Sequence, residues 1–119
     1  HVVGNLRKQI TPNGATVNRT YEVGTGTDYT PINVTINTVA GTSTNGTTYL
    51  TGSSTSGDHP NIATSGINSA RSVNRYWSLV KGGAWTLANY DATLNFVNSD
   101  KDPGTNYALA LSRRPRCVW

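Results

Sequence analysis

The residue types that nucleophilic catalysis requires are gathered between positions 56 and 69. Asp58 and His59 are adjacent, and three serines stand nearby, at Ser56, Ser65 and Ser69. A hydrolytic triad needs a serine hydroxyl within reach of the imidazole and a carboxylate that orients the ring. Neighbouring side chains usually point apart, however, and the sequence has no strained turn of the G-x-S-x-G type. We therefore expect no enzyme here, but a turn capped by Asp58, with His59 packed at the loop base.

Oxygen-bearing side chains that suit Ca²⁺ occur towards the C-terminus, at Asp91, Asp100, Asp102 and Asn106. Calcium takes about six to eight such ligands, but the run NSDKDPGTN lacks the ordered spacing of an EF-hand loop. One cysteine and two histidines do not form a tetrahedral zinc set. We expect Asx-rich turns without a metal or other cofactor, and Ca²⁺ at Asp100 and Asp102 stays an open alternative.

The aromatic residues indicate a core position and a candidate sugar site. Trp77 alternates with Leu79, which predicts that Trp77 is buried where sandwich folds commonly place a tryptophan. Trp85 and Tyr90 follow a predicted turn, so we expect them to be more exposed. Aromatic faces at such positions can stack on sugars, which makes Trp85 and Tyr90 the candidate glycan contacts.

The basic residues favour structural roles over nucleic-acid binding. The net charge is +4, but the ten lysines and arginines are mostly scattered, and no recognition helix or ribonucleoprotein motif is present. Arg71 and Arg75 are expected to pair with Asp58 or Asp91, or to bind backbone carbonyls of the neighbouring loop, because the guanidinium suits bidentate contacts.

The composition predicts one all-β domain over residues 1–119. Only 35% of the residues are hydrophobic and 13% charged, and Thr, Asn, Ser and Gly fill the balance. Threonine favours strands, whereas Asn, Ser and Gly favour turns. The sequence contains no run of about 18 apolar residues, which is the length that could span a membrane. The absence of an initiator Met indicates a mature or excised segment.

Period-two alternation of apolar and polar residues identifies the strands. It is clearest in PINVTINTV, and it recurs in TVNRTYEV, NRYWSLV and DATLNFV. Further candidates are VVGNLRKQI, TTYLTG, AWTLANY and YALALSR. Lys81-Gly82-Gly83 predicts a tight hairpin, and the segment from Gly52 through Ser72 predicts a long loop that crosses between sheets. These elements predict an antiparallel sandwich or barrel.

A family resemblance rests on three stretches, GDHPNIATSGINSARSVNRYW, VVGNLRKQI and YDATLNFVNSDKDPG. Together they resemble an immunoglobulin-like β-sandwich module of large secreted and cell-surface proteins of Bacteroidetes and related bacteria. The resemblance implies an extracellular structural or adhesive module of a surface fibre, filament or adhesin. No catalytic activity is implied. The glycan-binding module remains the alternative.

The ends of the chain predict self-association. The family pattern continues past the position of Trp119, so we expect an unpaired sheet edge that the N-terminal VVGNLRKQI or the basic tail of a neighbouring copy could complete. The alternative is that the missing strands lie elsewhere in a longer parent protein. The resemblance also implies a bacterial source, so the acceptor-like triplets at Asn18, Asn33 and Asn45 are expected to be unmodified.

Overall fold

The chain folds as an all-β protein. The computed structural model describes residues 1–37, 39–41, 47–87 and 89–105, and this part of the chain contains no α-helix. Its strands are β1 (Val2–Val3), β2 (Leu6–Gln9), β3 (Val17–Tyr21), β4 (Val23–Thr25), β5 (Asp28–Tyr29), β6 (Ile32–Asn37), β7 (Ala40–Gly41), β8 (Tyr49–Ser56), β9 (Arg75–Gly82), β10 (Trp85–Thr86) and β11 (Asn89–Leu94). Three short 3₁₀ turns are η1 (Ile62–Thr64), η2 (Ser69–Arg71) and η3 (Asn98–Asp100).

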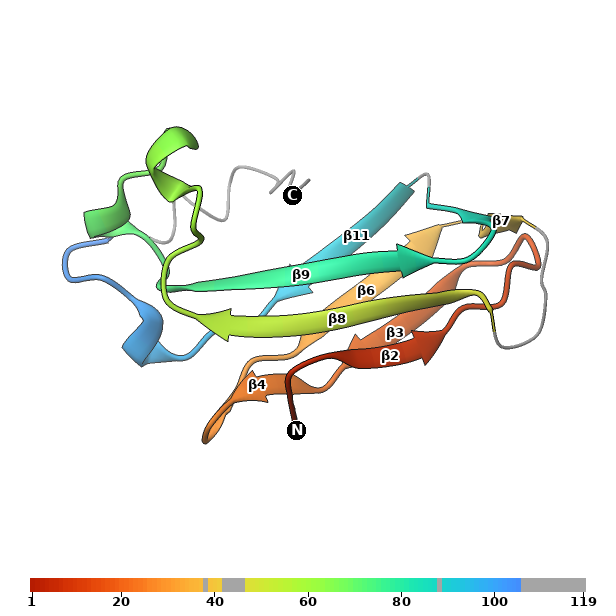
Figure 1. Cartoon of the computed structure of the whole chain (residues 1–119), viewed down its shortest axis with the longest axis horizontal. Coiled ribbons are helices and arrows are strands. Elements are labelled where there is room, and N and C mark those ends of the chain that lie inside the picture. The colour runs from red at the N-terminus through yellow and green to blue at the C-terminus, as the bar shows by residue number, and fades with distance from the viewer. Residues whose placement is uncertain (38, 42–46, 88, 106–119) are drawn as a thin grey trace.

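The strands form two layers around one apolar core. One sheet has the order β2-β8-β9 and another has the order β11-β6-β3, and both are antiparallel. Figure 1 shows the first sheet crossing in front of the second. Two smaller sheets, β1-β4-β5 and β10-β7, complete the set. The buried hydrophobic side chains are Ile10, Tyr21, Val23, Ile32, Val34, Ile36, Val39, Leu50 and Trp85.

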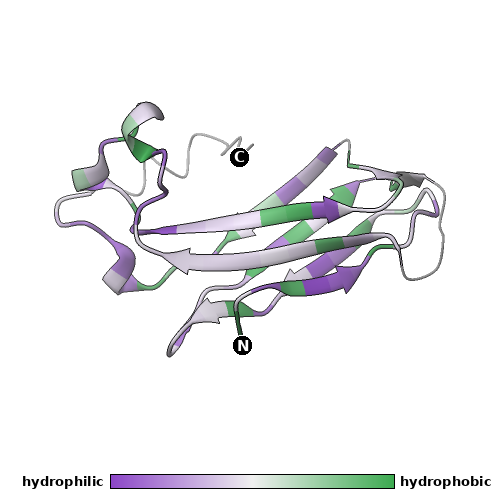
Figure 2. Cartoon of the chain, in the orientation of Figure 1, coloured by the Kyte–Doolittle hydropathy of each residue, from purple (hydrophilic) through white to green (hydrophobic). Residues whose placement is uncertain are grey.

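Strand β6 shows how the sequence builds these layers. Ile32, Val34 and Ile36 are buried, and the residues between them face outward, as the alternation predicts. Figure 2 shows hydrophobic segments on strands of both layers. The predicted strand YALALSR lies outside the described residues.

The predicted loop from Gly52 is wrong in its start and in its path. Strand β8 continues through Ser56, with Gly52 and Ser54 on its buried side. The loop begins only at Gly57 and returns the chain to β9, which pairs with β8 in the same sheet. After Leu50, the buried positions of β8 hold the small residues Gly52 and Ser54, so this part of the strand alternates in burial without alternating in hydropathy.

Lys81-Gly82-Gly83 is not a hairpin, because the strand that follows it does not pair with β9. β10 pairs with β7 instead, and the chain therefore leaves the β2-β8-β9 sheet at this point. Gly83 has a φ of +89°, and a Cβ on Gly82 would overlap the Tyr49 ring. A positive φ or a close contact with a neighbouring ring requires glycine just as a hairpin turn does. The Gly82-Gly83 pair in the sequence therefore could not distinguish a hairpin from a change of sheet.

The N-terminal VVGNLRKQI forms two strands in different sheets. The chain bends at Gly4, whose φ is +105°. β1 pairs in parallel with β4, and β2 pairs antiparallel with β8. The segment expected to complete a neighbour's sheet is therefore paired within its own chain.

Gly52→Ala should destabilise the fold, because an added Cβ would lie 2.8 Å from Cγ of the buried Tyr21 ring. Overpacking of this kind costs about 1–3 kcal/mol, which urea unfolding can measure. Ser53→Ala on the outward side of β8 is the matched control and should change the free energy of unfolding by less than about 0.5 kcal/mol. Equal stability of the two variants would contradict the packing of β8 on Tyr21.

Candidate functional site

His59 lies at the base of the β8–β9 loop. Its Nδ1 accepts a hydrogen bond from the backbone N–H of Asn61 at 3.1 Å, and its ring meets that of Tyr76 edge-on, with centroids 5.0 Å apart. The predicted packing of His59 is thus confirmed. A triad requires Nδ1–H to donate to a carboxylate, whereas this Nδ1 is an acceptor. In a neutral ring the proton then lies on Nε2.

Asp58 and Ser65, two other members of the predicted catalytic set, make hydrogen bonds within the loop. Asp58 Oδ1 accepts from the hydroxyl of Ser72 at 3.2 Å, a residue that the sequence did not single out. This contact joins side chains 14 residues apart, so the predicted turn cap at Asp58 is wrong. Ser65 Oγ donates to the carbonyl of Ile62 and accepts from the N–H of Ile67, and such local side-chain to backbone bonds stabilise turns.

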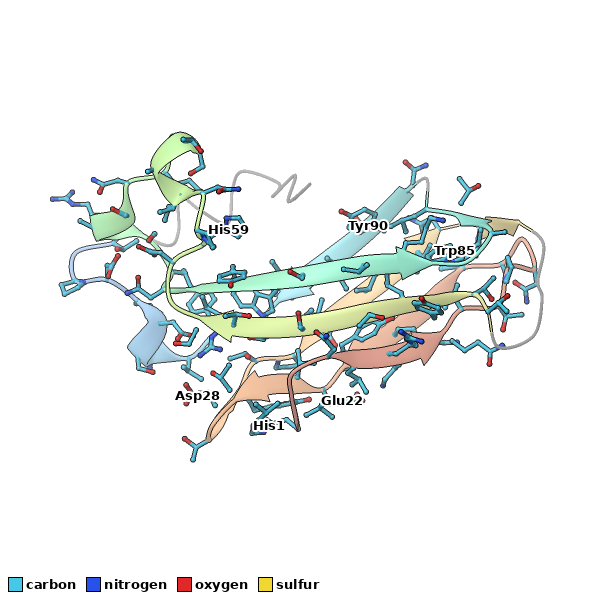
Figure 3. All side chains as sticks on the ribbon, in the orientation of Figure 1. His1, Glu22, Asp28, His59, Trp85 and Tyr90 are labelled. Carbon is cyan, nitrogen blue, oxygen red and sulfur yellow. The ribbon has the colours of Figure 1, made fainter. Side chains whose placement is uncertain are left out.

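Arg75 is the centre of a buried polar cluster. Its Nε and Nη2 bind the two carboxylate oxygens of Asp100 at 2.6 and 3.0 Å, and Nη2 also lies 3.2 Å from Asp28 Oδ2. Nη1 donates to the hydroxyls of Thr25 and Ser54 at 2.9 and 3.1 Å. The arginine side chain has no exposed surface, whereas Asp28, labelled in Figure 3, is part-exposed. The cluster joins β9 to β8, to η3 and to the β4–β5 turn.

The expected partners of the two arginines are wrong. Arg75 pairs with Asp100 and Asp28 instead of Asp58 or Asp91. Asp91 is exposed on β11, and Arg71 is exposed at the end of η2. Arg75 lies on the same side of its strand as Trp77, so its inward direction could be read from the sequence, but its partners could not.

Asp102, in the segment after η3, binds the end of the β8–β9 loop. Its Oδ2 accepts from the backbone N–H of Ser72 at 2.9 Å, and its Oδ1 accepts from the Asn74 amide at 2.8 Å. The Ser72 hydrogen bond, followed by that of Asn74, lowers the pKa of the Asp102 carboxyl below its ordinary value of 3.8. Val73 and Lys101 form a bridge between the same segments.

Contacts between segments distant in the chain, and not local Asx turns, engage the two central oxygen donors of the calcium alternative. Asp100 binds Arg75, and Asp102 binds Ser72 and Asn74. Within the described ranges, no three His, Cys, Asp or Glu residues are grouped so that they could hold a metal ion. Asn106 lies outside those ranges.

The predicted exposure of Trp85 is wrong, and Tyr90 is half-buried. Trp85 is only 3% exposed, and its indole Nε1 donates to the Gly82 carbonyl at 2.8 Å. Tyr90 packs against the core from β11. Figure 3 shows both side chains at the opposite end of the molecule from His59. The pairing of β10 with β7 turns Trp85 inward, so it offers no platform for stacking on a sugar.

Trp77, expected to be buried, packs against the core but is only partly buried. Its Nε1 donates to the carbonyl of Thr30 at 3.2 Å. Since β9 pairs with β8 alone among the described strands, its inward Trp77 and Leu79 are covered less completely than the inward side chains of β6.

A regular polar surface, which the sequence reasoning missed, covers the outward side of the β11-β6-β3 sheet. We call it the Asn/Thr face, and its residues are Asn18, Thr20, Asn33, Thr35, Asn37, Asn89, Asp91 and Thr93. All are exposed except Thr35, which is half-buried. The triplets at Asn18 and Asn33 lie here, and Asn45 lies outside the described residues. The sequence signal for this face was the alternating set of Asn and Thr residues in PINVTINTV.

Arg75→Ala should destabilise the protein strongly, because it leaves the carboxylate of Asp100 buried without its partner. Breaking a buried pair in this way costs about 3–5 kcal/mol. Arg71→Ala removes an exposed arginine from the same stretch and should cost less than about 0.5 kcal/mol. Chemical unfolding of both variants checks the difference, and similar midpoints would contradict the buried position of Arg75.

Asp102→Asn should weaken the dependence of stability on acid pH. Because the pKa of Asp102 is lowered in the folded protein, its contribution is complete above the unfolded-state pKa and is lost as pH falls through the folded-state pKa. As the pH is lowered from about 5 to about 2, the urea concentration at which half of the wild type is unfolded should therefore decrease. For Asp102→Asn this urea concentration should decrease less. The same pH dependence of the midpoint in both proteins would show that the Ser72 and Asn74 contacts do not stabilise the ionised carboxyl.

Comparison with protein-family models, with curated proteins and with solved structures gave no match. In the described part of the chain, no helix is long and apolar enough to cross a membrane. Function therefore has to be inferred from the chain's own sequence and geometry.

Proposed function

We propose that the chain is a non-enzymatic, immunoglobulin-like β-sandwich module of a bacterial surface fibre, filament or adhesin, and that it acts outside the cell as a structural unit. The low charge and the Thr- and Asn-rich composition support an extracellular setting. The three sequence stretches that resemble a secreted bacterial module motivate the choice of a surface setting. The hydrogen bonds of Asp58 to Ser72 and of His59 to Asn61 support a structural role for the stretch that holds the catalytic residue types.

The observation that carries the proposal is the outer edge of β9. Among the described residues, this eight-residue strand pairs only with β8. A long open edge presents a row of backbone N–H and C=O groups that can pair with another strand. Val80 on this strand is 59% exposed, and neither proline nor a bulge protects the centre of the edge.

A strand of a second copy is the proposed occupant of this edge. Strand addition would continue the β2-β8-β9 sheet and cover the half-buried Trp77 and Leu79. The N-terminal segment is already paired with β4 and β8, so β9 acts as the acceptor and a different segment of the neighbour is the donor. A contact between unlike surfaces propagates into a filament when its rotation does not close a ring.

Val80→Lys tests this proposal, because a lysine on an edge strand opposes strand addition. We expect the wild type to form oligomers or filaments in light scattering and electron microscopy, and Val80→Lys to remain monomeric. Thr55→Lys, at an exposed position on the central strand β8, is the control and should assemble like the wild type. A reductant prevents cross-linking through Cys117. A monomeric wild type at about 100 µM, or assembly that Val80→Lys does not change, would overturn the proposal.

A further inference from the structure

The Asn/Thr face is ordered by strand pairing into rows of polar side chains. In one row, Asn33 of β6 stands between Thr20 of β3 and Thr93 of β11. In the next row, Thr35 stands between Asn18 and Asp91. Residues of one face repeat about every 6.6–6.8 Å along a strand, and strands lie about 4.7–4.9 Å apart. The face is therefore a two-dimensional array of amides and hydroxyls.

Hydrogen bonds within the array orient its polar groups. The hydroxyl of Thr20 donates to Oδ1 of Asn33 at 2.9 Å, and that of Thr35 donates to Oδ1 of Asn18 at 2.7 Å. The hydroxyl protons of Thr20 and Thr35 are thus donated inside the array. Their oxygen atoms keep lone pairs that can accept hydrogen bonds from a ligand. Each of these two asparagine amides keeps N–H donors. The array offers donors and acceptors side by side in fixed positions.

Asparagine is an unfavourable choice for these positions if solvation is their only role. It is depleted in strands because its side chain competes with the backbone for hydrogen bonds, whereas threonine is favoured there. Four asparagines nevertheless occupy outward positions of β3, β6 and β11. Departures from local preference are expected where a surface has a function.

We infer that the Asn/Thr face binds a neutral polysaccharide that lies along the sheet. Sugar hydroxyls both donate and accept hydrogen bonds, which matches the paired amides and hydroxyls of the array. Asp91 is the one charged residue among its eight members, so the face lacks the cationic side chains that a polyanion requires. It also has no large apolar side chain that would suit a hydrophobic partner.

This surface differs from the aromatic platform first expected at Trp85 and Tyr90. Without aromatic stacking, one module binds weakly, and several modules in one chain or filament would bind tightly through effective concentration. The site lies on the sheet that does not contain β9, so polysaccharide binding and assembly are separable.

Binding to microcrystalline cellulose and to chitin, measured by co-sedimentation, tests the inference, with alginate beads as the polyanionic comparison. We expect the wild type to bind cellulose or chitin but not alginate. Asn33→Lys, at the centre of the array, should lower binding at least about tenfold, equivalent to about 1.4 kcal/mol. Thr55→Lys adds the same charge at an exposed position of the central strand β8, in the other sheet, and should bind like the wild type. Urea unfolding verifies that both variants are folded.

Several outcomes would overturn the inference. They are failure of the wild type to bind either neutral polysaccharide, equal loss in the Thr55→Lys control, and unchanged binding by Asn33→Lys. Self-association that Asn33→Lys abolishes, without polysaccharide binding, would assign the face to a second copy. Val80→Lys separates the two proposals, because a variant that cannot assemble should still bind polysaccharide as a single module.

Discussion

The buried guanidinium of Arg75 holds together three parts of the chain that are distant in sequence. It binds Asp100 after β11 and Asp28 between β4 and β6, and it reaches Ser54 on β8. Burying a guanidinium and a carboxylate costs several kcal/mol per ion unless all their hydrogen-bonding groups are satisfied. Five donor contacts supply that compensation here. At this end of the sandwich a polar cluster thus takes the place that apolar side chains fill elsewhere.

After Leu50, the inward positions of β8 hold the small residues Gly52 and Ser54, and the Arg75 cluster explains the second of them. Ser54 leaves room for the arginine and binds both it and the hydroxyl of Thr30, 2.7 Å away. Gly52, two residues earlier, leaves room for the ring of Tyr21. Burial raises the pKa of that phenol to about 12, so the ring remains neutral. Two large groups from the rest of the fold therefore decide which residues β8 can carry.

Sequence reasoning predicted the elements whose side chains alternate in hydropathy, such as Ile32, Val34 and Ile36 in β6. It failed for β8, because Gly52 and Ser54 are buried for their small size and not for their apolarity. It failed for Trp85 because the pairing of β10 with β7 is a long-range choice with no local signal. The direction of Arg75 was readable from its strand, but Asp100 lies 25 residues further on, beyond the reach of a periodicity argument.

The β8–β9 loop has its two ends bonded to each other, since the N–H of Gly57 donates to the carbonyl of Asn74 at 2.8 Å. Asp58 and Asp102 hold the same base through Ser72, whereas Ile67 and most of its neighbours are exposed. Lengthening a loop closed in this way costs only about 0.6 kcal/mol for each doubling. The tip therefore tolerates changes in length, and it is a place where a foreign peptide could be inserted for display without disturbing the strand register.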